Sequence, residues 1–232
     1  MVAKTRPLVT ARGRAWCAVI GPVQFTLTWL VLGMVSDGYT LWGEWIEYSP
    51  ISQPISGLGM GATAGVMNAS FVLLGVLLIV GSSGVSAGLP GLTGRARTTS
   101  AILLGLVGVG AIVDGVFNLE SILMHSLGFA LVISTIFGFP IVGRALRRTP
   151  LWRSLGRWLV AAGPVTLVLA IWYFASFDPT AAGEGEGIAG VTQRLLVTWI
   201  LAWYIVLGWR VATRPEVGRS LDARPSVGPV SR

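Results

Sequence analysis

Six polar or ionisable residues lie inside or directly beside long apolar segments of this chain: Asn68, Asp114, Asn118, His125, Gln193 and Arg194. A charge at the centre of a bilayer costs about 2.5–3.5 kcal/mol on insertion scales, so ionisable residues in apolar segments tend to face a protein interior or water. We therefore expect these six side chains to contribute to one polar pocket that binds a ligand.

His125 is the only histidine of the chain, which limits the available chemistry. One histidine cannot supply bis-histidine haem ligation or a multi-histidine zinc site within the chain, so we expect neither a cofactor nor a metal. Paired with Asp114 or a serine, His125 could activate a nucleophile. The serines considered for this pairing are Ser56, Ser70, Ser121 and Ser126. The alternative, which we prefer, is a structural hydrogen bond.

Arg194 is the only basic residue on its side of the predicted membrane. Three interpretations stay open for it. It could form an ion pair between helices with Asp114, Glu120 or Asp178. It could face a cavity and hold an anionic group through its planar set of donors. Finally, its guanidinium could extend along the helix to reach the membrane interface.

The architecture that positions these residues follows from composition and length. Hydrophobic residues make up 53% of the 232 residues and charged residues 12%, too little charge to cover a soluble globule. A bilayer core of about 30 Å needs roughly 20 apolar residues per helix. We predict an all-α, six-helix transmembrane bundle, built as three helical hairpins, over residues 1–213. The expected spans are about 15–35, 61–80, 99–117, 123–142, 155–175 and 188–211.

The distribution of charge predicts the orientation of the bundle. Sixteen of the seventeen Lys and Arg residues fall in the two terminal segments and in the second and fourth connections. Basic residues collect on the cytoplasmic side of membrane proteins, so we expect both termini in the cytoplasm, residues 214–232 as a disordered cytoplasmic tail, and the six polar residues toward the outer side. The same rule explains the net charge of +7 without a nucleic-acid partner. The excess of Arg over Lys and the abundance of Gly, Ala and Val indicate a bacterial genome of high GC content, so we expect the protein in a bacterial plasma membrane.

Two further features concern packing. Gly57, Gly61 and Gly65 lie four residues apart, and small residues at this spacing allow close approach of helices in lipid. We expect a packing seam within the bundle, or else a face for self-association. Pro50 and Pro54 bar a regular helix in the loop before the second span, and the apolar residues between and after them predict that this loop folds back onto the mouth of the bundle.

Several segments carry a family resemblance. SPISQPISGLG precedes a span that contains GVMNASFVLLGVLL, MHSLGFAL opens another span, and GVTQRLLVTWILAWYIVLGWR forms the last. In this order, over nearly the whole chain, they resemble an uncharacterised prokaryotic family known as domain of unknown function 998, which is distantly similar to the Frag and DRAM group. The matching positions are Ser49, Pro50, Ser56, Gly59, Asn68, His125, Gln193 and Arg194. Gln193 stands where members often have an acidic residue.

The resemblance implies a six-span membrane protein and supplies no activity. From the residues, we predict a protein that binds a lipid head group or a small anionic amphiphile in the outward polar pocket, as an accessory, sensor or scaffold. Membrane lipids are then its main partners. Two alternatives stay open: an intramembrane enzyme that acts on a lipid-linked substrate through His125, and a small-molecule transporter.

Overall fold

The computed structural model describes residues 6–89, 92–179 and 184–214, and most of them belong to helices. The α-helices are α1 (Arg6–Val35), α2 (Ala64–Gly88), α3 (Gly94–Val116), α4 (Ile122–Ile133), α5 (Thr135–Leu146), α6 (Arg153–Ser176) and α8 (Ala189–Ala212). The 3-10 helices are η1 (Ile55–Gly59), η2 (Gly61–Thr63), η3 (Leu119–Ser121) and η4 (Pro150–Trp152). Between α1 and η1, the chain forms an antiparallel pair of strands, β1 (Gly38–Leu41) and β2 (Glu44–Glu47).

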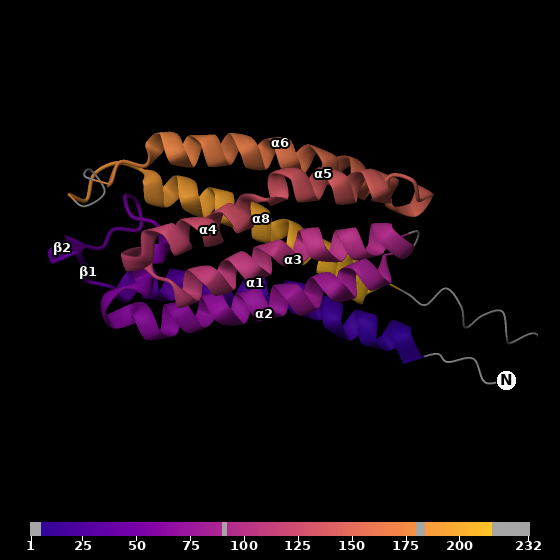
Figure 1. The fold of residues 1–232 in the computed structure, drawn as a ribbon, viewed down its shortest axis with the longest axis horizontal. Helices are drawn as coiled ribbons and strands as arrows, with labels where there is room; N and C mark the ends of the chain where they lie inside the picture. The colour runs from indigo at the N-terminus through magenta and orange to yellow at the C-terminus, as the bar shows by residue number, and fades with distance from the viewer. Residues whose placement is uncertain (1–5, 90–91, 180–183, 215–232) are drawn as a thin grey trace, which may run out of the picture.

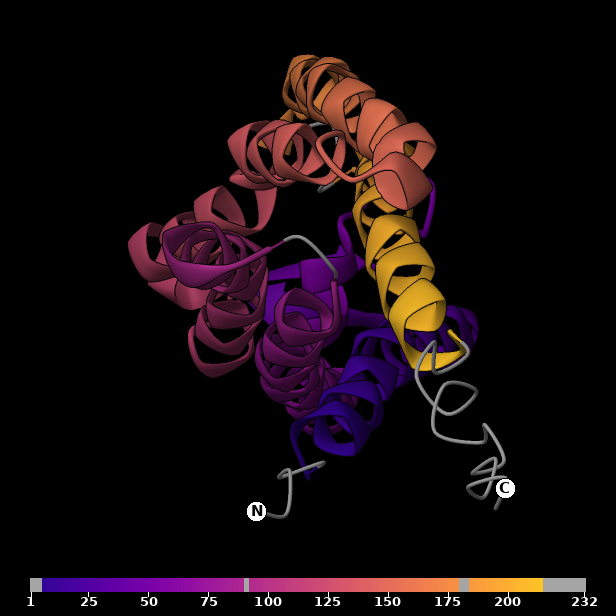
Figure 2. The ribbon, with the colours of Figure 1, turned by 90° about the vertical axis from the view of Figure 1, so that its right-hand side faces the viewer.

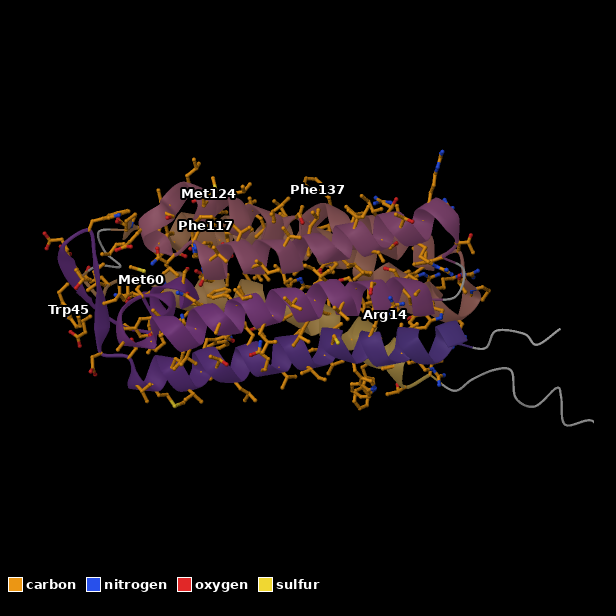
Figure 3. The ribbon with its side chains drawn as sticks, turned by 60° about the horizontal axis from the view of Figure 1, so that its bottom comes forward. Arg14, Trp45, Met60, Phe117, Met124 and Phe137 are labelled. Carbon is orange, nitrogen blue, oxygen red and sulfur yellow. The ribbon has the colours of Figure 1, made fainter. Side chains whose placement is uncertain are left out.

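In the described part of the chain, six helical segments are long and apolar enough to cross a membrane: Ala11–Val35, Gly61–Gly88, Gly94–Val116, Leu119–Leu146, Pro150–Ser176 and Ala189–Ala212. The prediction of an all-α, six-span membrane protein is confirmed. Large apolar side chains on the outside of these helices are exposed; Phe137, for example, is 70% exposed and projects away from the bundle (Figure 3). Such side chains are stable in contact with lipid tails.

The helices lie side by side along one long axis, with two chemically different ends (Figure 1). The β1–β2 pair and η1 lie at one end, which we call the hairpin end; Trp45 marks it in Figure 3. The other, where α1 begins and α8 ends, carries Arg14, Arg95, Arg144 and Arg210, and we call it the basic end. That the basic end faces the cytoplasm stays a prediction.

Each span contacts more than one neighbour. α2 packs against both α1 and α3, and α8 contacts α1 on one side and α6 on the other. Viewed along the bundle from the basic end, α5 and α6 lie on the side opposite α1 and α2 (Figure 2). The contacts thus join all the spans into one bundle, and the grouping into three hairpins stays a prediction.

Helix boundaries depart from the predicted spans at the basic end. α1 begins at Arg6 and α2 continues to Gly88, where the predicted spans began at about 15 and ended at about 80. The arginines and small residues that flank the apolar runs are compatible with helix in water. Apolar length therefore predicts where the membrane is crossed, and a helix can extend beyond it.

The predicted fourth span is two helices, because α4 ends at Ile133 and α5 begins at Thr135. At the break, the hydroxyl of Ser134 donates to the carbonyl of Leu131 at 2.6 Å, and the hydroxyl of Thr135 donates to that of Val132 at 3.4 Å. Serine and threonine hydroxyls that bond back to carbonyls one turn earlier bend helices. Two of them in succession account for the break.

The loop before the second span contains a β-hairpin that the sequence analysis did not predict. Gly38 pairs with Glu47 and Leu41 with Glu44, so Trp42 and Gly43 form a two-residue turn. Both turn residues have positive φ, 50° at Trp42 and 92° at Gly43, as a type I′ turn requires. After the hairpin the chain folds back into the mouth of the bundle, where Ser52, Ile55 and Leu58 are at most 2% exposed. The predicted return of this loop is therefore observed.

Candidate functional site

A narrow cavity of about 40 Å³ lies inside the hairpin half of the bundle. Its walls come from α1, α2, α3, α4, α8 and η1, and most of them are apolar. Along α3 it reaches from Val107 to Asp114, about 10 Å at ~1.5 Å per residue. Its polar lining residues are Ser56, Asp114, His125 and Gln193. The cavity is therefore a slot that is polar toward the hairpin end and apolar toward the middle of the bundle.

Asp114 and His125 form the polar pair of this slot. The Oδ1 atom of Asp114 lies 3.7 Å from Nδ1 of His125, and the two residues are 5% and 8% exposed. The same Oδ1 is buried without a hydrogen-bond partner in the described part of the chain. A methyl group on Gly128 would come within 2.1 Å of that oxygen, so α4 carries a glycine where the carboxylate packs against it.

The tautomer of His125 follows from its partner on the backbone. Nδ1 lies 2.9 Å from the carbonyl oxygen of Phe117. A carbonyl only accepts hydrogen bonds, so Nδ1 carries a proton and, in the neutral ring, Nε2 is the acceptor. Asp114 and His125, which line the polar end of the slot, thus each carry an acceptor: Oδ1 of Asp114 and, in the neutral ring, Nε2 of His125.

Gln193 closes the opposite wall of the slot and binds the loop that covers it. Its Oε1 accepts from the backbone N–H of Ile55 at 2.7 Å. Two residues earlier, the N–H of Val191 donates to the carbonyl of Ile51 at 3.1 Å. The first turn of a helix has N–H groups without intrahelical partners, and here the loop supplies one of them with an acceptor. The loop and the start of α8 therefore form one hydrogen-bonded unit.

Arg194 completes that unit and does not line the slot. Nη1 donates to the carbonyls of Pro50 at 2.8 Å, of Gln53 at 2.9 Å and of Gly190 at 2.9 Å. Nη2 donates to the hydroxyl of Tyr48. These four acceptors carry no full negative charge. We call this arrangement, Arg194 with its acceptors at residues 48–53, the loop latch.

Two aromatic residues support the loop latch. The guanidinium carbon of Arg194 lies 5.4 Å from the centre of the Trp29 ring, a distance at which a cation is attracted to the ring face. Burial raises the pKa of the Tyr48 hydroxyl, and the neighbouring Arg194 opposes that rise. The hydroxyl is therefore protonated at neutral pH, and its oxygen accepts from the guanidinium.

Asn68 and Asn118 lie outside the slot, each with a local partner. The amide of Asn68 donates to the carbonyl of Gly59 at 3.1 Å, next to the end of η1. The side-chain oxygen of Asn118 accepts from the N–H of Glu120 at 3.1 Å and caps η3. Of the six predicted site residues, the structure thus brings Asp114, His125 and Gln193 together around one cavity. It places Asn68, Asn118 and Arg194 beside it.

Two residues of this region, Tyr48 and Gly190, were not among the residues predicted from the sequence. A methyl group on Gly190 would come within 2.4–2.8 Å of the carbonyl oxygens of Pro50, Ile51 and Gln53. No pattern within α8 marks this contact, because the loop lies about 140 residues earlier in the chain. Within the described ranges, no group of three or more His, Cys, Asp or Glu residues could hold a metal ion.

Comparison with known proteins gives one match. Residues 19–210 match the model of a family described as a protein of unknown function (DUF998). The matched region covers all six membrane-spanning segments, in whole or in large part. Neither a curated protein nor a solved structure matches the chain.

Proposed function

Since the chain belongs to the DUF998 family, whose function is unknown, we propose its function from the slot: it binds a single-chain amphiphile with a small, uncharged, hydrogen-bonding head group. The chain of the amphiphile lies along the apolar part of the slot, and its head reaches Asp114 and His125. In this proposal the protein has a lipid-handling role in the membrane, as an accessory, sensor or scaffold.

The observation that carries the proposal is the unpartnered oxygen of Asp114. A buried polar atom without a hydrogen bond costs about 1–3 kcal/mol, and such atoms are rare in folded proteins. This atom belongs to Asp114, which lines the polar end of the slot. A hydroxyl donor from a ligand would satisfy it.

The shape of the slot supports a single chain rather than a bulky head group. A cavity of about 40 Å³ has room for only a few water-sized spheres, since one water needs about 10–15 Å³ on this measure. Its length along α3 is many times the width that this volume allows. A thin apolar chain fits such a space, and a sugar or a phosphate ester does not.

The charge of the slot favours an uncharged head group. The proposal based on sequence included an anionic amphiphile, held by Arg194. That guanidinium donates to the loop, and the residues that line the slot include no Lys or Arg. An anion in the slot would therefore meet no cation, whereas an alcohol can donate to Asp114.

A cavity-filling substitution tests the proposal. Ala111 is 2% exposed and lines the slot, so Ala111→Leu places three more carbons in it. Ala130 on α4 is exposed, and Ala130→Leu makes the same change toward the lipid. We expect mass spectrometry of extracted lipids to show one enriched single-chain species in the wild type and in Ala130→Leu, and about tenfold less in Ala111→Leu.

A second filling variant separates loss of binding from misfolding. Val107 also lines the slot and is 2% exposed. Val107→Phe should deplete the same species while the protein still elutes as a single peak in detergent. Equal amounts of every lipid in the wild type and both filling variants would refute the proposed function.

A further inference from the structure

A second hollow lies at the basic end, far from the slot. Its volume is about 420 Å³, and its lining consists of five arginines: Arg144, Arg147, Arg148, Arg153 and Arg157. Two of the five come from α5 and α6 near their contact, two from the turn after α5, and one from the start of α6. We propose that this hollow, which we call the arginine hollow, binds the phosphate groups of an anionic phospholipid.

Close contact between α5 and α6 brings the five arginines together. A methyl group on Gly143 would lie 2.7 Å from the carbonyl oxygen of Gly156, and one on Gly156 would lie 2.7 Å from that of Gly143. Each glycine directly precedes one of the arginines, Arg144 or Arg157. The orientation of a membrane protein requires only that basic residues lie on its cytoplasmic side. It does not require that five arginines converge on one hollow, which results from the packing of α5 against α6.

Carboxylates in the described part of the chain do not balance the charges of the arginine hollow. Among the described residues, no Asp or Glu forms a salt bridge with any of the five guanidiniums. A sixth cation lies close, because Arg214 stacks over the ring of Trp152, 5.6 Å from its centre, next to Arg153. Like charges held together raise the free energy of the empty site. An anion with several charged oxygens would lower it.

The chemistry of the site selects phosphate. Guanidinium groups bind phosphate oxygens through paired N–H donors, which makes arginine the preferred residue for this group. Basic pockets at the ends of transmembrane helices are suited to phospholipid head groups. The hollow is open to water, since all five arginines are exposed.

The surface beside the hollow identifies a lipid as the source of the phosphate. Leu151 in η4, two residues before Arg153, is 70% exposed, and Trp158 in α6, next to Arg157, is 63% exposed. Tryptophan is enriched at the level of the head groups. A phospholipid can place its phosphates among the arginines and its chains along Leu151 and Trp158. A free phosphate ion has no apolar part that could contact Leu151 and Trp158.

The test uses the full-length protein in detergent and measures binding by native mass spectrometry and by thermal stabilisation. The probes are a phospholipid with two phosphates (diphosphatidylglycerol), phosphatidylcholine as the zwitterionic lipid, and inorganic pyrophosphate as the free anion. We expect the lipid with two phosphates to bind and to raise the melting temperature. Phosphatidylcholine and pyrophosphate should have less than a tenth of that affinity. Binding should weaken as salt is raised, because exposed charges are screened.

Matched triple variants locate the binding site. Arg144→Gln, Arg148→Gln and Arg153→Gln together should lower the affinity for the diphosphate lipid about a hundredfold, since each basic residue near a membrane surface contributes about 1 kcal/mol and 1.4 kcal/mol is about tenfold. The control removes three other exposed arginines at the same end, in Arg14→Gln, Arg95→Gln and Arg210→Gln, and should change affinity less than threefold.

A variant that keeps the positive charge separates loss of lipid binding from failure of the protein to insert into the membrane. Arg144→Lys, Arg148→Lys and Arg153→Lys together keep the positive charge that directs topology and remove the paired donors, so affinity should fall severalfold in a folded protein. Equal loss in the two glutamine variants would show that the lipid responds only to net charge, and would overturn the site. Equal protection by pyrophosphate would overturn the lipid assignment.

Discussion

Replacing Arg194 by alanine should release the loop from the start of α8 and lower the melting temperature of the protein by about 6–12 °C. The substitution removes four donated hydrogen bonds, to Pro50, Gln53, Gly190 and Tyr48. A buried acceptor that loses its partner costs about 1–3 kcal/mol, and 1 kcal/mol corresponds to about 2–4 °C in a chain of this size. Even two such losses make this one of the largest single effects expected.

The opening of the loop latch can be measured directly by labelling. Ser52 is 0% exposed and its hydroxyl has no hydrogen-bond partner in the described chain, so Ser52→Cys in a Cys17→Ser background is a mild reporter. We expect a maleimide to label it slowly when Arg194 is present and at least tenfold faster in Arg194→Ala. Arg210→Ala, which removes an exposed arginine from the other end of α8, should leave both the labelling and the melting temperature unchanged. If Arg194→Ala behaves like that control, the loop latch does not hold the loop.

Replacing Gly190 by alanine should have an effect of similar size for a steric reason. The added methyl would meet three backbone carbonyl oxygens of the loop at 2.4–2.8 Å. Backbone atoms cannot turn aside as a flexible side chain can, so the whole segment 50–53 must move away from α8. Overpacking of this kind costs about 1–3 kcal/mol, and the displaced hydrogen bonds add to it. We expect a fall in melting temperature of about 6–12 °C.

A glycine with open space provides the comparison. Gly105, in α3, has no atom within 4 Å of the position that a Cβ would take. Gly105→Ala should therefore be neutral or stabilising by up to about 1 kcal/mol, because alanine loses less backbone freedom than glycine in a helix. A similar change in melting temperature at both sites would show that the contact between Gly190 and the loop is absent in solution.

The architecture was predictable from sequence because lipid imposes a simple rule on it. A span must be apolar for about 20 residues and its backbone must bond internally, so six apolar runs give six helices. The break at Ser134 was not predictable in the same way, since its cause is local hydroxyl bonding within an uninterrupted apolar run. The hairpin at Trp42 and Gly43 was missed because each strand has only four residues.

The candidate site was predictable in part. The residues predicted correctly differ from the others in the groups that they contact. Asp114, His125 and Gln193 were selected as polar residues in apolar helices, and they do line one cavity. Arg194 was selected for the same reason, but its partners are carbonyls of a loop that is distant in sequence. Backbone acceptors are present at every residue and leave no mark in the sequence. The packing seam predicted at Gly57, Gly61 and Gly65 is wrong, because Gly57 lies in η1, Gly61 lies in η2, and a methyl group on Gly65 would meet no atom within 4 Å. Close contact between helices occurs at Gly75 and Gly108 instead.

A photoreactive long-chain primary alcohol tests the central claim most directly, by showing where such a molecule binds. We expect the probe, added to the purified wild-type protein, to label residues inside the slot such as Phe71, Val107 and Val197. An excess of unlabelled alcohol should compete with it, and Ala111→Leu should abolish this labelling. Labelling confined to outward residues such as Phe137 and Val168, which are 70% and 64% exposed, and unaffected by Ala111→Leu would contradict the account.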